Sequence, residues 1–193
     1  GNDEDGVTIP AAGIETAPGQ NVTLNARCNG GGAVAGWIDW NHNGVFDPAE
    51  KSAQVTCDGR SNATLRWTVP EDVVRSIDGE TGSQPHTYLR VRTAKAGVDL
   101  KPTGSTMDGE VEDYRLAVRV PTIQLVKNVQ APYTGQVKAL GADQWTLKAQ
   151  QGNGGAASLQ VTGTVDTGIK VTRPGQYGLS ESSTNPQAPG YEA

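Results

Sequence analysis

The chain has few of the residues on which enzyme active sites most often depend. Its 193 residues include two histidines and two cysteines. Two histidines far apart in the sequence do not suggest a nucleophile triad. The sequence also lacks a glycine-rich phosphate loop, a Gly-x-Ser-x-Gly elbow, a His-Glu-x-x-His motif and a Cys-x-x-Cys pair. We therefore expect that this protein is not an enzyme.

Long apolar runs and an excess of basic residues are absent as well. No run approaches the 18 apolar residues of a membrane-spanning helix. The net charge is −5 and the pI is about 5.0, whereas binding of nucleic acid requires a clustered basic face. We expect neither a nucleic-acid partner nor membrane insertion. Neither a signal peptide nor a C-terminal anchoring signal is evident, which indicates a mature fragment of a longer protein.

Glycine, proline and short alternating segments are abundant. The chain has 25 glycines, 11 prolines and no helical heptads, which favours an all-β protein with many turns. Pro121 marks a boundary between two predicted β-sandwich domains in tandem, 1–120 and 121–193. The second domain ends without an evident last strand, which would leave an open sheet edge. The predicted strands are 21–28, 33–40, 53–57, 62–69, 87–93 and 110–120 in the first domain, and 122–129, 144–150, 157–165, 168–173 and 176–182 in the second.

The two cysteines share the phase of the apolar residues in their predicted strands. Cys28 alternates in step with Val22 and Leu24, and Cys57 with Val55. Both side chains should therefore point toward the core, where they can form a disulfide; two buried free thiols are the alternative. A disulfide predicts an oxidising, extracellular setting.

Residues 39–50 fit the twelve-residue calcium-loop pattern D-x-[DN]-x-[DN]-G-x5-E. In such loops side-chain and carbonyl oxygens surround the ion, and a final glutamate contributes two oxygens. The alternative is an Asn/Gly-rich turn whose side chains bind their own backbone. Because Gly36-Trp37-Ile38 before the loop is strand-like, we expect a Ca²⁺ loop within a β-domain rather than an EF-hand. The residues expected to bind Ca²⁺ are Asp39, Asn41, Asn43, Val45 (through its carbonyl), Asp47 and Glu50.

Four motifs in the first domain occur in the order found in a known family. They are Asp3-Glu4-Asp5-Gly6-Val7, Gly36-Trp37-Ile38-Asp39-Trp40-Asn41, Leu89-Arg90-Val91-Arg92 and Gly109-Glu110-Val111-Glu112-Asp113-Tyr114. Together they resemble the GEVED domain of bacterial surface and secreted proteins over residues 3–120. The resemblance implies a β-sandwich module in extracellular, often adhesin-like proteins, without a defined catalytic activity.

The acidic motif places carboxylates at the end of a core-facing stripe. Glu110 and Glu112 share a face with Tyr114, and unpaired buried charge is costly. Either a salt-bridge network or a second metal ion could supply the positive charge. The residues of this expected cluster are Asp3, Asp5, Glu110, Glu112 and Asp113, with Arg90 and Arg92 as the candidate cations.

Lys127 and Glu181 occupy the apolar phase of two strands in the second domain. A buried Lys and a buried Glu are rare unless paired, so an ion pair is expected. The segments 125–128 and 174–181 also resemble prealbumin-like repeats of collagen adhesins and pilins. In that family a lysine forms an isopeptide bond to a residue of the last strand with help from a glutamate. Lys127 and Glu181 match these two positions, whereas the acceptor strand does not appear before the chain ends.

These features predict a Ca²⁺-stabilised, non-catalytic fragment of a bacterial cell-surface adhesin or stalk, located at the cell surface or secreted. One alternative is a subunit of an extracellular fibre or pilus assembled by strand complementation. Another is a module that binds a host glycan or matrix protein, for which Trp37 is the expected exposed aromatic residue. The expected partners are the rest of a longer surface protein, other copies of the chain, or such a host ligand.

Overall fold

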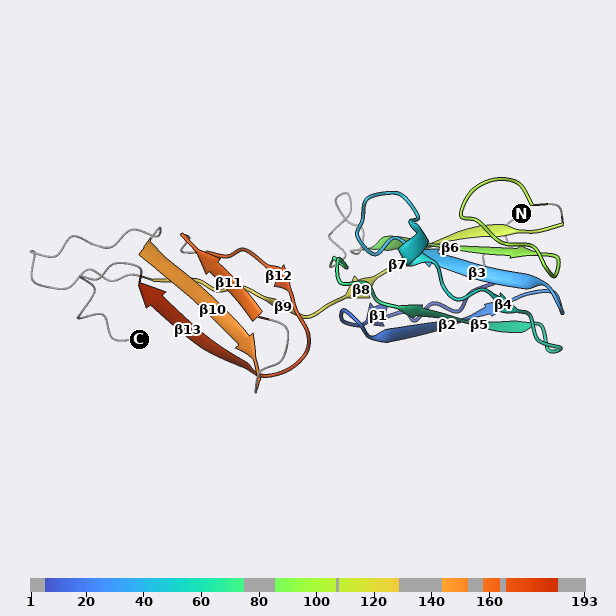
Figure 1. Ribbon diagram of the computed structural model, residues 1–193. Coiled ribbons are helices and arrows are strands. Elements are labelled where there is room, and N and C mark those ends of the chain that lie inside the picture. Colours follow the sequence, from blue (N-terminus) through green and yellow to red (C-terminus); the bar gives the residue numbers. More distant parts are fainter. Residues whose placement is uncertain are drawn as a thin grey trace, which may run out of the picture. The chain divides into compact units, whose positions relative to one another are not determined.

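The computed structural model describes residues 6–74, 86–106, 108–128, 144–152, 158–163 and 166–183. The chain divides into two compact units, Gly1–Val120 and Pro121–Ala193. The predicted all-β class is confirmed, because the regular elements within the described ranges are strands apart from one 3-10 turn, Pro48–Glu50 (Figure 1). No helix in this part of the chain is long and apolar enough to cross a membrane.

The first unit is built from two facing layers of antiparallel strands (Figure 1). One layer pairs β2 with β5, and the other has the order β4-β3-β6-β7. A short parallel pair, β1 with β8, adds to the same unit. The bounds of these strands are β1 Ile14–Glu15, β2 Asn21–Arg27, β3 Ala33–Ile38, β4 Val55–Thr56, β5 Asn62–Thr68, β6 Thr87–Ala94, β7 Val111–Leu116 and β8 Val118–Arg119.

Strict alternation in β2 and β5 builds the core between the two layers. Every second residue of each strand is buried, and the antiparallel register sets Leu24 opposite Leu65 and Val22 opposite Trp67. The two layers approach closely at Gly36, where a Cβ would lie 2.7 Å from the Trp67 ring. Glycine at this position therefore allows the large Trp67 ring to fill the core.

Strand β3 is buried on both faces, which corrects the expected exposure of Trp37. This tryptophan is 1% exposed. Its face of the sheet is covered by residues that follow β6, with Leu100 in the same buried cluster and Val98 packed against it. Because Trp40 and Trp67 are also buried, these three rings offer no platform for sugar stacking.

Several predicted strands are shorter than expected. The pattern at 33–40 gives β3, which ends at Ile38, and the pattern at 110–120 is divided between β7 and β8. In the second unit, the predicted strand 122–129 contains a two-residue strand and an isolated bridge between Val126 and Asp166; residue 129 lies outside the described part of the chain.

The second unit contains a three-stranded antiparallel sheet of order β11-β10-β13 and a short antiparallel pair, β9 with β12. Trp145, Leu147 and Ala149 alternate along β10 and are buried, as the sequence predicts. The bounds are β9 Thr122–Ile123, β10 Trp145–Gln151, β11 Ser158–Thr162, β12 Lys170–Val171 and β13 Tyr177–Ser183.

Candidate functional site

The loop 39–50 begins where β3 ends and closes with the 3-10 turn Pro48–Glu50. Its tight course uses two left-handed backbone positions, His42 at φ 57° and Gly44 at φ 77°. A Cβ on Gly44 would meet no atom within 4 Å, so the backbone conformation rather than lack of space favours glycine there.

Three polar side chains of the loop turn toward its own backbone. The Asp39 carboxylate accepts hydrogen bonds from the N–H groups of Asn43 (3.1 Å) and Gly44 (3.0 Å). The Asn41 side-chain oxygen accepts from Asn43 N–H at 3.0 Å, and that of Asn43 accepts from Val45 N–H at 2.8 Å. Such bonds occur both in Asx turns and in oxygen-lined ion loops, so they fit either interpretation.

Glu50 distinguishes this loop from a simple polar turn. Its side chain is 2% exposed, and its two oxygens accept from the N–H groups of Trp40 (2.8 Å) and Asp47 (2.9 Å). Burial raises the pKa of the Glu50 carboxyl, and the charge of Asp39 adds to this shift against the lowering effect of the N–H donors. Asp39 is itself 5% exposed. Two carboxylates in electrostatic reach are thus withdrawn from water within one loop, which is costly without a compensating positive charge.

The donor set of the loop suits a hard cation. A carboxylate offers about four lone-pair sites, so Asp39 and Glu50 each keep acceptor capacity beyond the bonds to N–H groups. Within the described residues, no three Asp, Glu, His or Cys side chains are arranged to hold a metal ion by themselves. An ion at this loop would therefore also need oxygens of Asn41, Asn43 and the Val45 carbonyl. An all-oxygen set with buried negative charge is the chemistry that Ca²⁺ prefers.

The basic residues of β6 do not pair with the two glutamates as the sequence suggested. The register sets Arg90 opposite Asp113, and the two form a two-pronged ion pair with distances of 2.7 and 2.6 Å. Arg92 is 2% exposed and donates to the backbone carbonyls of Lys101 (2.5 Å), Thr103 (2.9 Å) and Gly104 (2.6 Å). Arg90 pairs with Asp113, another member of the expected cluster, rather than with Glu112, because cross-strand neighbours share a face and Asp113 is the neighbour of Arg90.

Glu110 and Glu112 have different surroundings. Glu110 is exposed, and its N–H donates to the Thr93 hydroxyl at 3.2 Å. The Glu112 carboxylate accepts a short hydrogen bond from the Tyr114 hydroxyl. Asp3 and Asp5 lie outside the described residues, so a second metal site that includes them stays a prediction.

The Glu112–Tyr114 pair holds the start of the described chain against β7. The Tyr114 hydroxyl accepts from Val7 N–H at 3.1 Å, and the Glu112 carboxylate lies so close to Gly6 that a side chain there would collide with it. Gly6 in turn accepts from Arg27 N–H on β2 at 2.5 Å. The acidic motif therefore fastens residues 6 and 7 between β2 and β7. Burial and the Glu112 carboxylate raise the pKa of Tyr114 well above its usual value.

Replacing Tyr114 with Phe should lower the free energy of unfolding by about 1–3 kcal/mol, because Val7 N–H and Glu112 lose their shared partner. The pKa of Tyr114 is raised in the folded state, so this tyrosine contributes stability below the unfolded-state value of about 10 and loses it as the pH rises further. Urea unfolding at neutral pH and above pH 10 checks both effects. Equal stability of the two proteins at neutral pH would contradict this role, as would identical alkaline losses.

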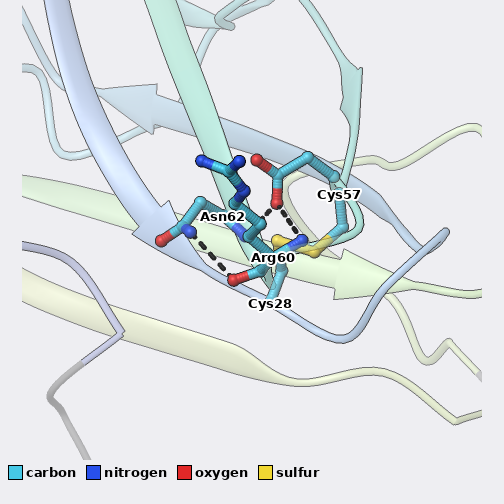
Figure 2. The surroundings of a disulfide bond; sticks show 5 residues. Cys28, Cys57, Arg60 and Asn62 are labelled. Atoms are coloured by element: carbon cyan, nitrogen blue, oxygen red, sulfur yellow. Dashed lines mark hydrogen bonds between the residues drawn. A yellow bond between two sulfur atoms is a disulfide. The ribbon is translucent and has the colours of Figure 1, made fainter.

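The predicted disulfide between Cys28 and Cys57 is present, with a Cα–Cα distance of 5.9 Å (Figure 2). Cys28 follows β2 and Cys57 follows β4, so the bond joins the two layers of the first unit. The turn beside it is closed by Asp58, which accepts from the N–H groups of Arg60 and Asn62, each at 2.8 Å.

Lys127 and Glu181 form an ion pair in the second unit, with an Nζ–Oε1 distance of 2.5 Å. Their side chains are 13% and 23% exposed. The Lys127 ammonium also lies 4.2 Å from the centre of the Trp145 ring, a cation–π contact. The Lys127 ammonium and the Glu181 carboxylate both occupy positions where the strand pattern predicts apolar residues, and each therefore compensates the charge of the other.

Several residues of structural importance near the loop carry no sequence signal. Lys51 and Gln54 bind the backbone of residues 98–100, and Arg92 binds that of residues 101–104. Of these three residues, only Arg92 belongs to a sequence pattern, the pair Arg90 and Arg92. That pattern predicts carboxylate partners rather than backbone carbonyls.

Comparison with known proteins gives one match. No curated protein and no solved structure matches the chain. One family model matches residues 33–117, a segment that includes the loop 39–50, the Arg90–Asp113 pair and the Glu112–Tyr114 pair. This model describes the GEVED domain, the family that the sequence motifs of the first unit resemble.

Proposed function

We propose that the chain is a calcium-stabilised, non-catalytic module of a bacterial surface or secreted protein, which serves as a stalk or adhesin segment. The observation that carries this proposal is the pair of buried carboxylates, Asp39 and Glu50, in a loop otherwise rich in amide and carbonyl oxygens. The disulfide supports an oxidising compartment, since such bonds persist mainly outside the cytoplasm.

In this proposal the ion would be held by Asp39, Asn41, Asn43, Asp47 and Glu50, with the Val45 carbonyl as a further ligand. The ion would supply the positive charge that two buried carboxylates need. A cation that binds the folded state alone stabilises it by mass action. The loop would thus make the first unit more stable in a calcium-rich medium than after chelation.

Thermal unfolding with calcium and with excess chelator tests this proposal. Calcium at about one hundred times its dissociation constant contributes about 2.7 kcal/mol. For a unit of this size the melting temperature should then fall on the order of 10 °C after chelation. The Asp39→Asn variant loses a charge and keeps one of the two oxygens that accept from the loop N–H groups. Its melting temperature should therefore respond little to chelation.

Asp58→Asn is the matched control. Asp58 also accepts two backbone N–H bonds in a turn, but it lies outside the loop 39–50. This variant should keep the full response to chelation. A wild-type melt that chelation leaves unchanged would contradict the proposal.

A second candidate function, a fibre subunit assembled by strand complementation, rests on the second unit. Within the described residues β13 pairs with β10 alone. Leu179 on β13 is 66% exposed and Val126 is 67% exposed, and both line a groove of about 470 Å³. A strand edge that no other described strand covers, beside exposed aliphatic side chains, favours pairing with a further strand. Self-association in sedimentation experiments, lost in Leu179→Lys, would support this candidate, and a monomer at high concentration would oppose it.

The Lys127–Glu181 pair supports the proposal that the second unit is prealbumin-like. Intact-mass measurement addresses the covalent form of this idea, because an isopeptide bond lowers the mass by one molecule of ammonia when the acceptor is Asn and by one molecule of water when it is Asp. A mass equal to that of the unmodified chain would restrict Lys127 to the ion pair.

A further inference from the structure

We infer that the loop 39–50 and the segment 98–104 form one cation-dependent unit, in which binding of calcium to the loop orders the segment. This inference rests on the proposed function for the binding of calcium. It goes further by naming a second surface element that the ion controls, which has no residue among the proposed ligands.

The two segments share one small core. Trp37, Ala35 and Leu100 belong to a buried cluster on the outer face of β3. Phe46, from the loop 39–50, and Val98 pack against the same cluster and are partly buried. The loop 39–50 and the segment 98–104 therefore both supply apolar side chains that cover the outer face of β3. A shift of Phe46 would change the packing of Val98 and Leu100.

Side chains, rather than a neighbouring strand, hold the backbone of residues 98–104. Gln54 donates to the Val98 carbonyl and accepts from Leu100 N–H, each at 2.9 Å. Arg90 donates to the Pro102 carbonyl at 3.1 Å, and Arg92 donates to three carbonyls that follow Leu100. A segment without a strand ladder opens at low cost once one of these contacts is lost.

Two residues connect the loop directly to this segment. Lys51 follows Glu50 in the chain, donates to the Leu100 carbonyl at 2.6 Å and lies 5.4 Å from the Trp37 ring centre. The Arg90 guanidinium lies 5.1 Å from the Phe46 ring centre while it binds the Pro102 carbonyl. Movement of Glu50 or Phe46 therefore acts on a residue that holds residues 98–104.

These contacts make the coupling reciprocal. If a bound ion fixes the loop and thereby stabilises the ordered segment 98–104, then loosening this segment must lower the affinity of the loop for the ion by the same factor. The physical consequence is that calcium sets how well the outer face of β3, including Trp37, is covered. The surface formed by residues 98–104 would then differ between calcium-rich and calcium-poor media.

The test uses Gln54→Ala, which removes both Gln54 bonds to the segment without touching a proposed ligand. Calcium affinity is measured by calorimetry on the whole chain, and amide exchange is measured with and without calcium. We expect calcium to slow exchange in residues 98–104 of the wild type, and Gln54→Ala to weaken calcium binding by about fivefold, at the lower end of typical coupling. Thr64→Ala is the control, because Thr64 is exposed on β5 and binds Asn25 on β2, both in the layer that does not contain β3; the calcium affinity of this variant should equal that of the wild type.

The outcomes separate the inference from the function on which it rests. Calcium binding with unchanged affinity in Gln54→Ala and unchanged exchange at 98–104 would overturn the inference and leave the proposed function intact. Absence of calcium binding by the wild type would overturn both.

Discussion

Replacing both Cys28 and Cys57 with serine should lower the free energy of unfolding of the first unit by about 3 kcal/mol. The two residues are 29 positions apart, so the bond removes a large part of the freedom of the unfolded chain. It also joins the end of β2 to the end of β4, which belong to different layers of the sandwich.

Urea unfolding followed by tryptophan emission measures this effect, because three of the four tryptophans lie in the first unit. Wild-type protein under reducing conditions should behave like the double variant. A loss below about 1 kcal/mol would be under the usual range for a native disulfide and would contradict the structural role given to it.

Replacing Arg92 with Met should cost about 3 kcal/mol or more, since one charged group then leaves several carbonyl acceptors without a partner. Arg92 is 2% exposed, and its acceptors are the carbonyls of Lys101, Thr103 and Gly104. These residues follow Leu100, which lies in the same buried cluster as Trp37. Methionine keeps much of the side-chain volume, so the loss reports mainly on the hydrogen bonds.

Arg66→Met provides the comparison for this variant. Arg66 is exposed on β5, where the same substitution removes no buried contact and should change stability by about 0.5 kcal/mol or less. Similar losses in the two variants would show that Arg92 does not hold residues 101–104 in place.

Alternation of apolar and polar residues along the chain is sufficient to predict the layer formed by β2 and β5 and the disulfide. Leu24 and Leu65 recur in phase with their neighbours, and a period of two fixes which face is buried. The same phase placed Cys28 and Cys57 toward the core. Local pattern also identified the loop 39–50, because its polar residues and Gly44 are contiguous in sequence.

Trp37 and Arg92 show where local pattern failed. Alternation separates the two faces of β3 but does not indicate that a later loop covers the outer face. Arg92 binds carbonyls 9 to 12 positions ahead, and backbone acceptors have no sequence signature. The partner of Arg90 depends on the strand register, because a shift of one residue would turn every side chain of β7 to the opposite face of the sheet.

Calorimetric titration of calcium into chelator-treated protein measures whether the loop 39–50 binds calcium, as we propose. We expect saturable binding in the wild type and in Asp58→Asn, with binding strongly weakened in Asp39→Asn. Absence of measurable heat and affinity in the wild type would contradict the proposed calcium site and would make residues 39–50 a polar turn closed by its own backbone.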